Sequence, residues 1–313
     1  MNLRFLTATS VAALTAFAAS GAFAATLTLA SYNIKHGQGN DGVVDLARQA
    51  AVMASFNAQA IALQEVDIRN DRTDKVDEPL VLAAELSRLT GGDWRALEAP
   101  AIAYRGGHYG NAMLYDASAL TLSGYVTLKL PGAPDGDGAR SAAYATFEAE
   151  GVGAFQFIGT HWTHRDVETT PGSTIQLDSI GIVEAAIDKT VPAFFGGDFN
   201  ASIRPEDNAS QATMQTLVDA GWSIDSPVNQ GGTMPGGSTA VIDYILSHGA
   251  GDLSVASSMV VVNADTEITS DHYPVVVSYE TADAPVAPVP LPAGGALALA
   301  AFAALGMVAR HRR

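Results

Sequence analysis

Short apolar runs alternate with segments of helical periodicity along most of this chain. The apolar runs are rich in β-branched and aromatic residues, and they predict strands at residues 27–33, 60–64, 112–115, 142–147, 154–160, 191–195, 241–246, 258–262 and 275–279. Apolar residues recur with helical spacing at residues 44–56, 79–89, 174–187 and 209–220. Segments rich in Gly and Pro, at residues 131–138 and 230–238, predict turns or flexible loops. Strands interleaved with helices predict a layered α/β fold.

A second pattern lies in the polar residues that accompany these strands. Four apolar runs end at Asn33, at Glu65, at His161, and at Asp198 with Asn200; Asp243 lies inside an apolar run, and Asp271 and His272 directly precede one. Each residue alone is best interpreted as a capping residue in a turn. Six strands with the same feature indicate a shared site, because buried charge is unfavourable unless it is paired or bound to a metal. We therefore expect these side chains to converge where strand ends meet at one edge of a sheet sandwich.

The residue types narrow the chemistry of this expected site. Carboxylate and amide oxygens suit a hard cation such as Mg²⁺, Mn²⁺ or Ca²⁺, and imidazoles suit proton transfer or hydrogen bonding to a phosphate oxygen. Zinc stays open as an alternative, although the HExxH spacing is absent. The chain has no cysteine and no G-x-S-x-G motif, so a thiolate site is excluded and a serine triad is poorly supported. A glycosidase with paired carboxylates also stays open as an alternative, although it would need neither the amides nor the Asp-His pair.

Composition and charge set the size of the domain and limit its partners. The chain has 313 residues, of which 48% are hydrophobic, and it shows no internal repeat, which fits one large domain at residues 26–283. A net charge of −16 argues against a broad basic face for nucleic acid. It does not exclude a phosphate substrate, because a bound cation inverts the local field.

The two ends of the chain predict export. Residues 1–25 combine Arg4, an apolar stretch and the A-x-A-like run Ala22-Phe23-Ala24, which is typical of a signal peptide. A Pro-rich linker at residues 284–292 leads to an apolar helix with a basic end at residues 293–313. The apolar part of this helix, residues 293–309, is about 17 residues long, which is near the lower limit for a membrane span. This tail resembles the VPLPA-type C-terminal sorting signals of Gram-negative bacteria. The resemblance implies export to the periplasm, cell envelope or medium, with the helix kept in a membrane or processed by sorting machinery.

The polar segments also match a known family in order along the chain. The strings SYNIKHG, ALQEVD, GTHWTHRD, GGDFNAS, IDYIL and SDHYPV resemble the signature of the endonuclease/exonuclease/phosphatase superfamily, the deoxyribonuclease I-like hydrolases. YRGGHYGNAMLY, which contains Asn111, and ARSAAYATF, which contains Arg140, resemble two further blocks. The match spans about residues 27–280. It implies a four-layer sandwich, in which two mixed β-sheets pack face to face with helices outside.

The resemblance also implies a role for each residue of the site. Glu65 would hold the divalent cation, Mg²⁺ or alternatively Mn²⁺ or Ca²⁺, with Asn33 and Asp271 nearby. His272 would act as general base or phosphate partner, oriented by Asp243, and Asp198 would position or activate the attacking water or hold a second metal. The scissile phosphate would be bound by Asn200 and His161, with support from Arg140 and Asn111.

These observations predict a secreted or envelope-anchored, metal-dependent phosphoesterase that acts as a monomer. A nuclease, a phospholipid phosphodiesterase and a phosphatase for small compounds all fit. The expected substrate is therefore a phosphate ester, and nucleic acid and a lipid headgroup are both open as its source. The alternative from a different class is a catalytically silent binding or adhesion module of the envelope on the same fold. Retention of the complete set of acids, amides and imidazoles argues against that alternative.

Overall fold

A computed structural model describes residues 24–132, 138–207 and 211–282 of the chain. Residues Ala25–Ala282 form one compact unit. Nearly all of the expected signal peptide, and the whole of the expected linker and C-terminal helix, lie outside the described residues. Within the described part, none of the helices combines the length and the apolar character needed to cross a membrane.

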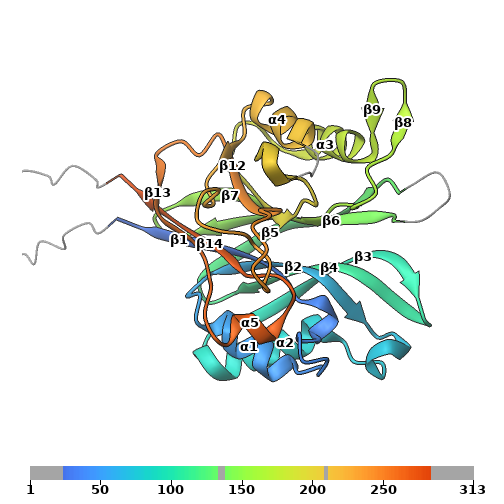
Figure 1. Ribbon diagram of the computed structural model, residues 1–313. Helices are drawn as coiled ribbons and strands as arrows, with labels where there is room; N and C mark the ends of the chain where they lie inside the picture. The colour runs from blue at the N-terminus through green and yellow to red at the C-terminus, as the bar shows by residue number, and fades with distance from the viewer. Residues whose placement is uncertain (1–23, 133–137, 208–210, 283–313) are drawn as a thin grey trace, which may run out of the picture. The chain divides into compact units, whose positions relative to one another are not determined.

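Two six-stranded mixed sheets form the centre of this unit (Figure 1). The first sheet has the order β13 (Leu253–Val260), β14 (Val275–Thr281), β1 (Thr26–Asn33), β2 (Ala60–Ile68), β4 (Gly107–Asp116) and β3 (Trp94–Tyr104). The second has the order β11 (Ser223–Ile224), β12 (Asp243–His248), β10 (Ala193–Asp198), β7 (Gly153–His161), β6 (Arg140–Ala149) and β5 (Leu120–Leu130). The β1–β2 and β10–β7 pairs are parallel and all other strand pairs are antiparallel. A small hairpin, β8 (Glu168–Thr170) and β9 (Ser173–Thr174), extends from the second sheet's side.

Helices cover the outer face of each sheet (Figure 1). The first sheet is covered by α1 (Leu46–Ala54), α2 (Glu78–Thr90) and α5 (Thr266–Thr269), and the second by α3 (Ile175–Ala186) and α4 (Gln211–Asp219). Single 3-10 turns lie at Lys35–Gly37, Asp71–Thr73 and Pro205–Asp207. Side chains of Asp45, Asp77 and Thr174 accept hydrogen bonds from the first-turn amides of α1, α2 and α3, which fixes where these helices begin. The predicted four-layer sandwich is confirmed.

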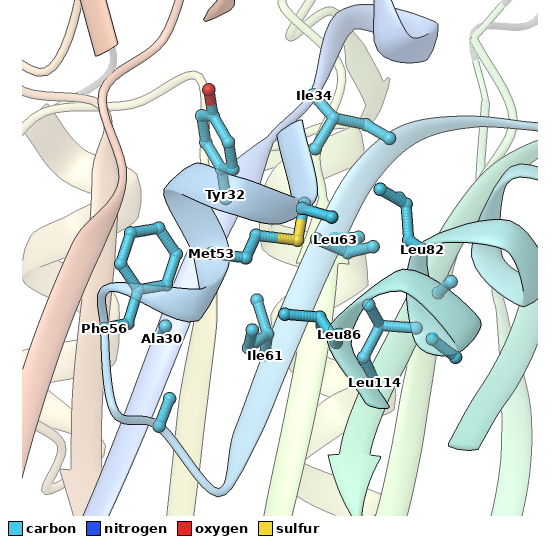
Figure 2. Close-up of a cluster of buried hydrophobic side chains, with 14 of the residues drawn as sticks. Ala30, Tyr32, Ile34, Met53, Phe56, Ile61, Leu63, Leu82, Leu86 and Leu114 are labelled. Atoms are coloured by element: carbon cyan, nitrogen blue, oxygen red, sulfur yellow. The ribbon is translucent and has the colours of Figure 1, made fainter. Parts of the chain in front are cut away.

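Three apolar clusters fill the three interfaces between layers. Between the first sheet and its helices, Met53 of α1 and Leu86 of α2 meet Ile61 and Leu63 of β2 (Figure 2). The space between the sheets is filled by aromatic side chains, including Phe147, and the sheets approach closely at Gly159, where an added Cβ would lie 2.8 Å from the Cβ of Ala62. The third cluster packs α3 and α4 on the second sheet.

Two long strands were not predicted, and both lie at the edges of their sheets. The sequences of β3 and β5 mix charged, small and apolar residues, and most of their side chains are only half-buried or exposed. Because an edge strand carries a weaker apolar signal than a central strand, the periodicity of these segments does not reveal them. The four predicted helices are all present, each with ends within two residues or so of the expected ones.

Candidate active site

The strand register brings the predicted polar residues to one end of both sheets. In the second sheet, Asp198 at the end of β10 lies opposite His161 at the end of β7 and opposite Asp243 at the start of β12. In the first sheet, Asn33 is the last residue of β1, and Glu65 lies in the neighbouring strand β2. Both sheets therefore present carboxylate, amide or imidazole groups at the same end of the sandwich.

Two local predictions about these strands were wrong. Glu65 does not end a strand, because β2 continues to Ile68, and the register between β2 and β4 shifts between Leu63 and Val66. Glu65 lies in this bulge with φ +58°, which redirects its side chain out of the strand alternation. Asp243 is the first residue of β12 rather than an interior residue, so its carboxylate also lies at a strand end.

Asn33 connects the two sheets through its amide group. Its Nδ2 donates to Glu65 Oε1 at 3.1 Å and to Asp198 Oδ2 at 3.1 Å, and its Oδ1 accepts from the Lys35 backbone N–H at 3.1 Å. The side chain is completely buried, and its backbone carbonyl accepts from Ser270 Oγ at 2.7 Å. One amide therefore holds a carboxylate of each sheet, and its three contacts fix which end of the amide is the donor.

His272, Asp243 and Asp198 form a buried charged group. His272 Nδ1 lies 2.9 Å from Asp243 Oδ2, and its Nε2 lies 3.7 Å from Asp198 Oδ2. Burial opposes protonation of His272, but Asp243 and Asp198 outweigh it and raise the pKa of His272 to about 10. Burial, together with the charge of Asp243, raises the pKa of Asp198 to about 7. At neutral pH in the absence of metal, this imidazole is therefore protonated while Asp198 is close to its own titration point.

His161 has the opposite electrostatic environment. Burial, followed by the positive charges of Arg140, His272 and His164, holds the pKa of His161 well below its usual value, so its ring is neutral. Asn200 Nδ2 donates to the Trp162 carbonyl at 2.9 Å and lies 3.1 Å from His161 Nε2. Because a carbonyl can only accept, the amide orientation is fixed and His161 Nε2 is the acceptor. The proton of the neutral ring is then on Nδ1.

Asn200 is placed by the turn that follows β10. Its φ of +46° is in the left-handed region, and its backbone N–H donates to Asp198 Oδ1 at 2.9 Å. Phe199 between them packs edge to face against Trp162 and Phe195, with ring centroids 4.7 and 4.9 Å away. The aromatic core below the turn thus fixes both polar side chains above it.

Asp271 lies at the exposed side of the group. Its Oδ2 pairs with Lys35 Nζ at 2.8 Å, and its side chain is 37% exposed. It directly precedes His272 in the chain, so its backbone position is tied to the buried pair.

Arg140 and Asn111 lie on strands that face each other across the sandwich. Arg140 begins β6, and its charge lowers the pKa of His161 after the larger effect of burial. Asn111 of β4 is almost completely buried and donates to the Ser141 carbonyl at 2.6 Å. Asn111 therefore holds the start of β6, and with it Arg140, against the first sheet.

Sequence analysis missed several residues that support the site. Ser270 donates to the Asn33 carbonyl and accepts from the His272 backbone N–H at 3.3 Å; its position beside Asp271 and His272 was the available signal. Gln176 is buried at the start of α3, where its Nε2 donates to the carbonyl of Thr163 at 2.9 Å. Nothing in the local sequence distinguishes Gln176 from an ordinary helix residue.

The charged group has the composition and the unsatisfied atoms expected of a cation site. Ligand atoms of Asp198, Asp243 and His272 lie within 4.8 Å of one another. Asp243 Oδ1 and Asp271 Oδ1 are buried carboxylate oxygens without a hydrogen-bond partner. Buried anionic oxygens are unfavourable without a proton or a cation beside them, so the carboxylates of the site fit a divalent metal, whereas the protonated His272 has no lone pair to offer one. Members of the family matched below typically use such ions.

Comparison with known proteins identifies the relatives of this chain. The model of the Endonuclease/Exonuclease/phosphatase family matches residues 30–272, whereas no curated protein matches the chain. An endonuclease/exonuclease/phosphatase from Beutenbergia cavernae has a similar structure, with a TM-score of 0.65 and 24% identity over 84% of this chain and 73% of that one. A mannosyl-6-phosphatase from Bacteroides thetaiotaomicron is similar with a TM-score of 0.58 and 19% identity, over 81% and 99% of the two chains. The catalytic domain of human nocturnin is similar with a TM-score of 0.57 and 18% identity, over 82% and 94%. The family model covers most of this chain, and the fold of the chain agrees with it, so this chain belongs to the Endonuclease/Exonuclease/phosphatase family.

Proposed function

We propose that this chain is an exported, divalent-metal-dependent phosphoesterase that hydrolyses phosphodiesters or phosphomonoesters. The observation that carries the proposal is the continuous network from Glu65 through Asn33 to Asp198, with His272 and Asp243 beside it. A silent module would have no need of a carboxylate whose pKa is raised to about 7, since burial of this carboxylate costs folding stability at neutral pH. Export is supported by the signal-like N-terminus and by the sorting-type tail.

The pKa directions separate the roles that the sequence left open. Asp198, with its pKa raised to about 7, is suited to accept the proton of the attacking water at neutral pH. Asp243 and Asp198 raise the pKa of His272 to about 10, which favours its protonated form, so we assign its Nε2–H to a non-bridging phosphate oxygen. Asn200 fixes the ring of the neutral His161, which lines the same centre and would orient the phosphate.

The reaction then balances with one water molecule. The water oxygen bonds to phosphorus, its proton goes to Asp198, the bond from phosphorus to the leaving oxygen breaks, and that oxygen takes a proton from solvent. Glu65, with Asn33 and Asp271, would hold the divalent cation, whose chemistry is to withdraw charge from the phosphoryl oxygens. Arg140 adds a fixed positive charge on the same side as His161.

The test is hydrolysis of bis-p-nitrophenyl phosphate by the purified full chain with Mg²⁺, Mn²⁺ or Ca²⁺, and again after chelation. We expect metal-dependent release of nitrophenol and a loss of about 10²–10⁴-fold in kcat for Asp198→Asn. Asp252→Asn is the matched control, because Asp252 is an exposed carboxylate in the turn between β12 and β13, at the opposite end of these strands. Absence of turnover with every cation, or full activity of Asp198→Asn, would overturn the proposal.

A further inference from the structure

Two tyrosines and two arginines form a cluster beside the catalytic centre, which we name the tyrosine–arginine wall. It comprises Arg72 after β2, Tyr104 at the end of β3, Arg105 in the following turn and Tyr109 near the start of β4. Arg72 Cζ lies 5.1 Å from the ring centroid of Tyr104 and 5.4 Å from that of Tyr109. Arg105 Cζ lies 5.4 Å from the Tyr104 ring. None of the four has a role in the reaction described above.

The strand register places the wall next to the phosphate site. Tyr109 lies opposite Asp67 of β2, two residues beyond Glu65. Two residues after Tyr109 on the same strand, Asn111 bonds to Ser141 of the second sheet. Because side chains alternate along a strand, Tyr109 faces the second sheet as Asn111 does.

The electrostatic environment of Tyr109 agrees with that position. Burial is the main cause of its raised pKa, and the charges of Glu65, Arg140 and Asp198 all act on it as well. These three residues belong to the catalytic centre. Tyr109 therefore forms the border between that centre and the rest of the wall.

The wall is held rigidly from behind. Arg72 donates from Nε and Nη2 to the two carboxylate oxygens of Asp67, at 2.8 and 2.7 Å, and Asp67 is completely buried. The Arg72 backbone N–H donates to Asn70 Oδ1 at 2.9 Å, and Asn70 Nδ2 donates to the His108 carbonyl at 2.9 Å. A surface fixed in this way loses little side-chain entropy when a ligand packs against it.

The chemistry of the wall matches a flat ring rather than a chain of phosphates. Tyrosine rings and guanidinium planes are the groups on which nucleobases stack in proteins. The charge of Arg72 is balanced by Asp67, which leaves the exposed Arg105 as the cation of the wall's outer side. A nucleic acid polymer would need many cations along its phosphates, and the chain carries a net charge of −16.

We propose that the tyrosine–arginine wall binds the nucleoside joined to the scissile phosphate, so that the substrate is a small nucleotide ester and not a nucleic acid polymer. This inference rests on the proposed function, because the nucleoside reaches the wall only when its phosphate is bound at the catalytic centre. Tyr104 and Arg105 are specificity residues in this arrangement, and neither takes part in the hydrolysis itself.

The test compares two chromogenic diesters with the same leaving group. Thymidine 5′-(p-nitrophenyl phosphate) carries a nucleoside, and methyl p-nitrophenyl phosphate carries a methyl group in its place. We expect the wild-type enzyme to favour the thymidine ester in kcat/KM, and the ratio of the two kcat/KM values to fall about tenfold in Tyr104→Ala and in Arg105→Ala. Arg95→Ala is the matched control, because Arg95 is an exposed arginine at the other end of β3 and should leave the ratio unchanged.

The outcomes separate this inference from the proposed function. If the wild-type enzyme hydrolyses both esters and the ratio is the same in both wall variants, the inference is wrong and the proposed function stands. If neither ester is hydrolysed with any of the three cations, the proposed function fails as well. Cleavage of plasmid DNA that is faster than thymidine ester hydrolysis and equally reduced by Arg105→Ala would refute the preference for small nucleotides.

Discussion

Replacement of Asp243 by asparagine tests the electrostatic account of the active site most directly. The Asp243 carboxylate is 2% exposed and lies 2.9 Å from His272 Nδ1, and it contributes most to raising the pKa of His272 from 6.5 to about 10. A rise of this size favours the protonated ring by several kcal/mol, at about 1.4 kcal/mol per pKa unit. In Asp243→Asn the opposing effect of burial remains, so His272 should be largely neutral at pH 7. The phosphate then loses a charged donor, which predicts a fall in kcat of about 10²–10³-fold.

Two measurements check this prediction. The first is kcat with bis-p-nitrophenyl phosphate between pH 5 and pH 9, and the second is the NMR titration of the His272 ring in the metal-free protein. Asp225→Asn is the control, because Asp225 is a half-buried carboxylate that accepts from Tyr279 Oη at 2.6 Å outside the site. The reasoning is refuted if the kcat of Asp243→Asn stays within about threefold of the wild-type kcat, which is far less than the predicted loss. It is also refuted if His272 of the variant still titrates near its wild-type value.

Stability supplies a further check with a defined sign. A histidine whose pKa is raised on folding stabilises the protein fully below its unfolded value, near 6.5, and this stability is lost as the pH rises through the folded value. The difference in free energy of unfolding between metal-free wild type and Asp243→Asn should therefore shrink from about pH 6.5 to about pH 10.

Two more predictions concern the folded framework. Burial raises the pKa of Glu78 to about 8, so the stability linked to its protonation is present below about pH 4.5 and is lost as the pH rises through 8. We therefore expect the free energy of unfolding of Glu78→Gln, measured by urea denaturation, to be about 2–4 kcal/mol higher than that of wild type at pH 9, with a smaller gain at pH 6. An equal gain at both pH values would contradict this. Gly159→Ala should destabilise the fold by about 1–3 kcal/mol, because the added Cβ would lie 2.8 Å from Ala62 between the sheets. Gly124→Ala in β5, where the nearest atom is 3.8 Å away, is the matched control, and equal thermal stability of the two variants would refute the argument.

The central strands and the main helices could be predicted because their signal is local. A strand such as β1 is buried over almost its whole length, and its sequence is a short run of β-branched and apolar residues that ends at Asn33. Because the strand is buried, a polar residue at its end is unfavourable without a partner and therefore indicates a site. The edge strands β3 and β5 have less buried surface, and their sequences carry little that separates them from loops.

The members of the site could be named from the sequence, but their individual environments could not. Asp198 and His272 both follow from their places at strand ends and from the family resemblance. Their pKa values depend on burial and on the distance between their side chains, and neither quantity is encoded locally. The bulge at Glu65 was also hidden, because it arises from the pairing of β2 with β4.

The sequence by itself determined the order of the central strands and the main helices, and the set of polar residues at the strand ends. Hydrophobic periodicity within a few residues suffices for these elements, because it reflects which side of each element is buried, and the family resemblance adds the set of polar residues. Tertiary structure alone decided that Asn33 joins carboxylates of both sheets, including Asp198, which is 165 residues away in the sequence. It also decided that Ser270, 237 residues from Asn33, donates a hydrogen bond to the Asn33 carbonyl. Such contacts form only when the two sheets pack face to face, since the packing fixes which strand ends meet and how far water is excluded from them.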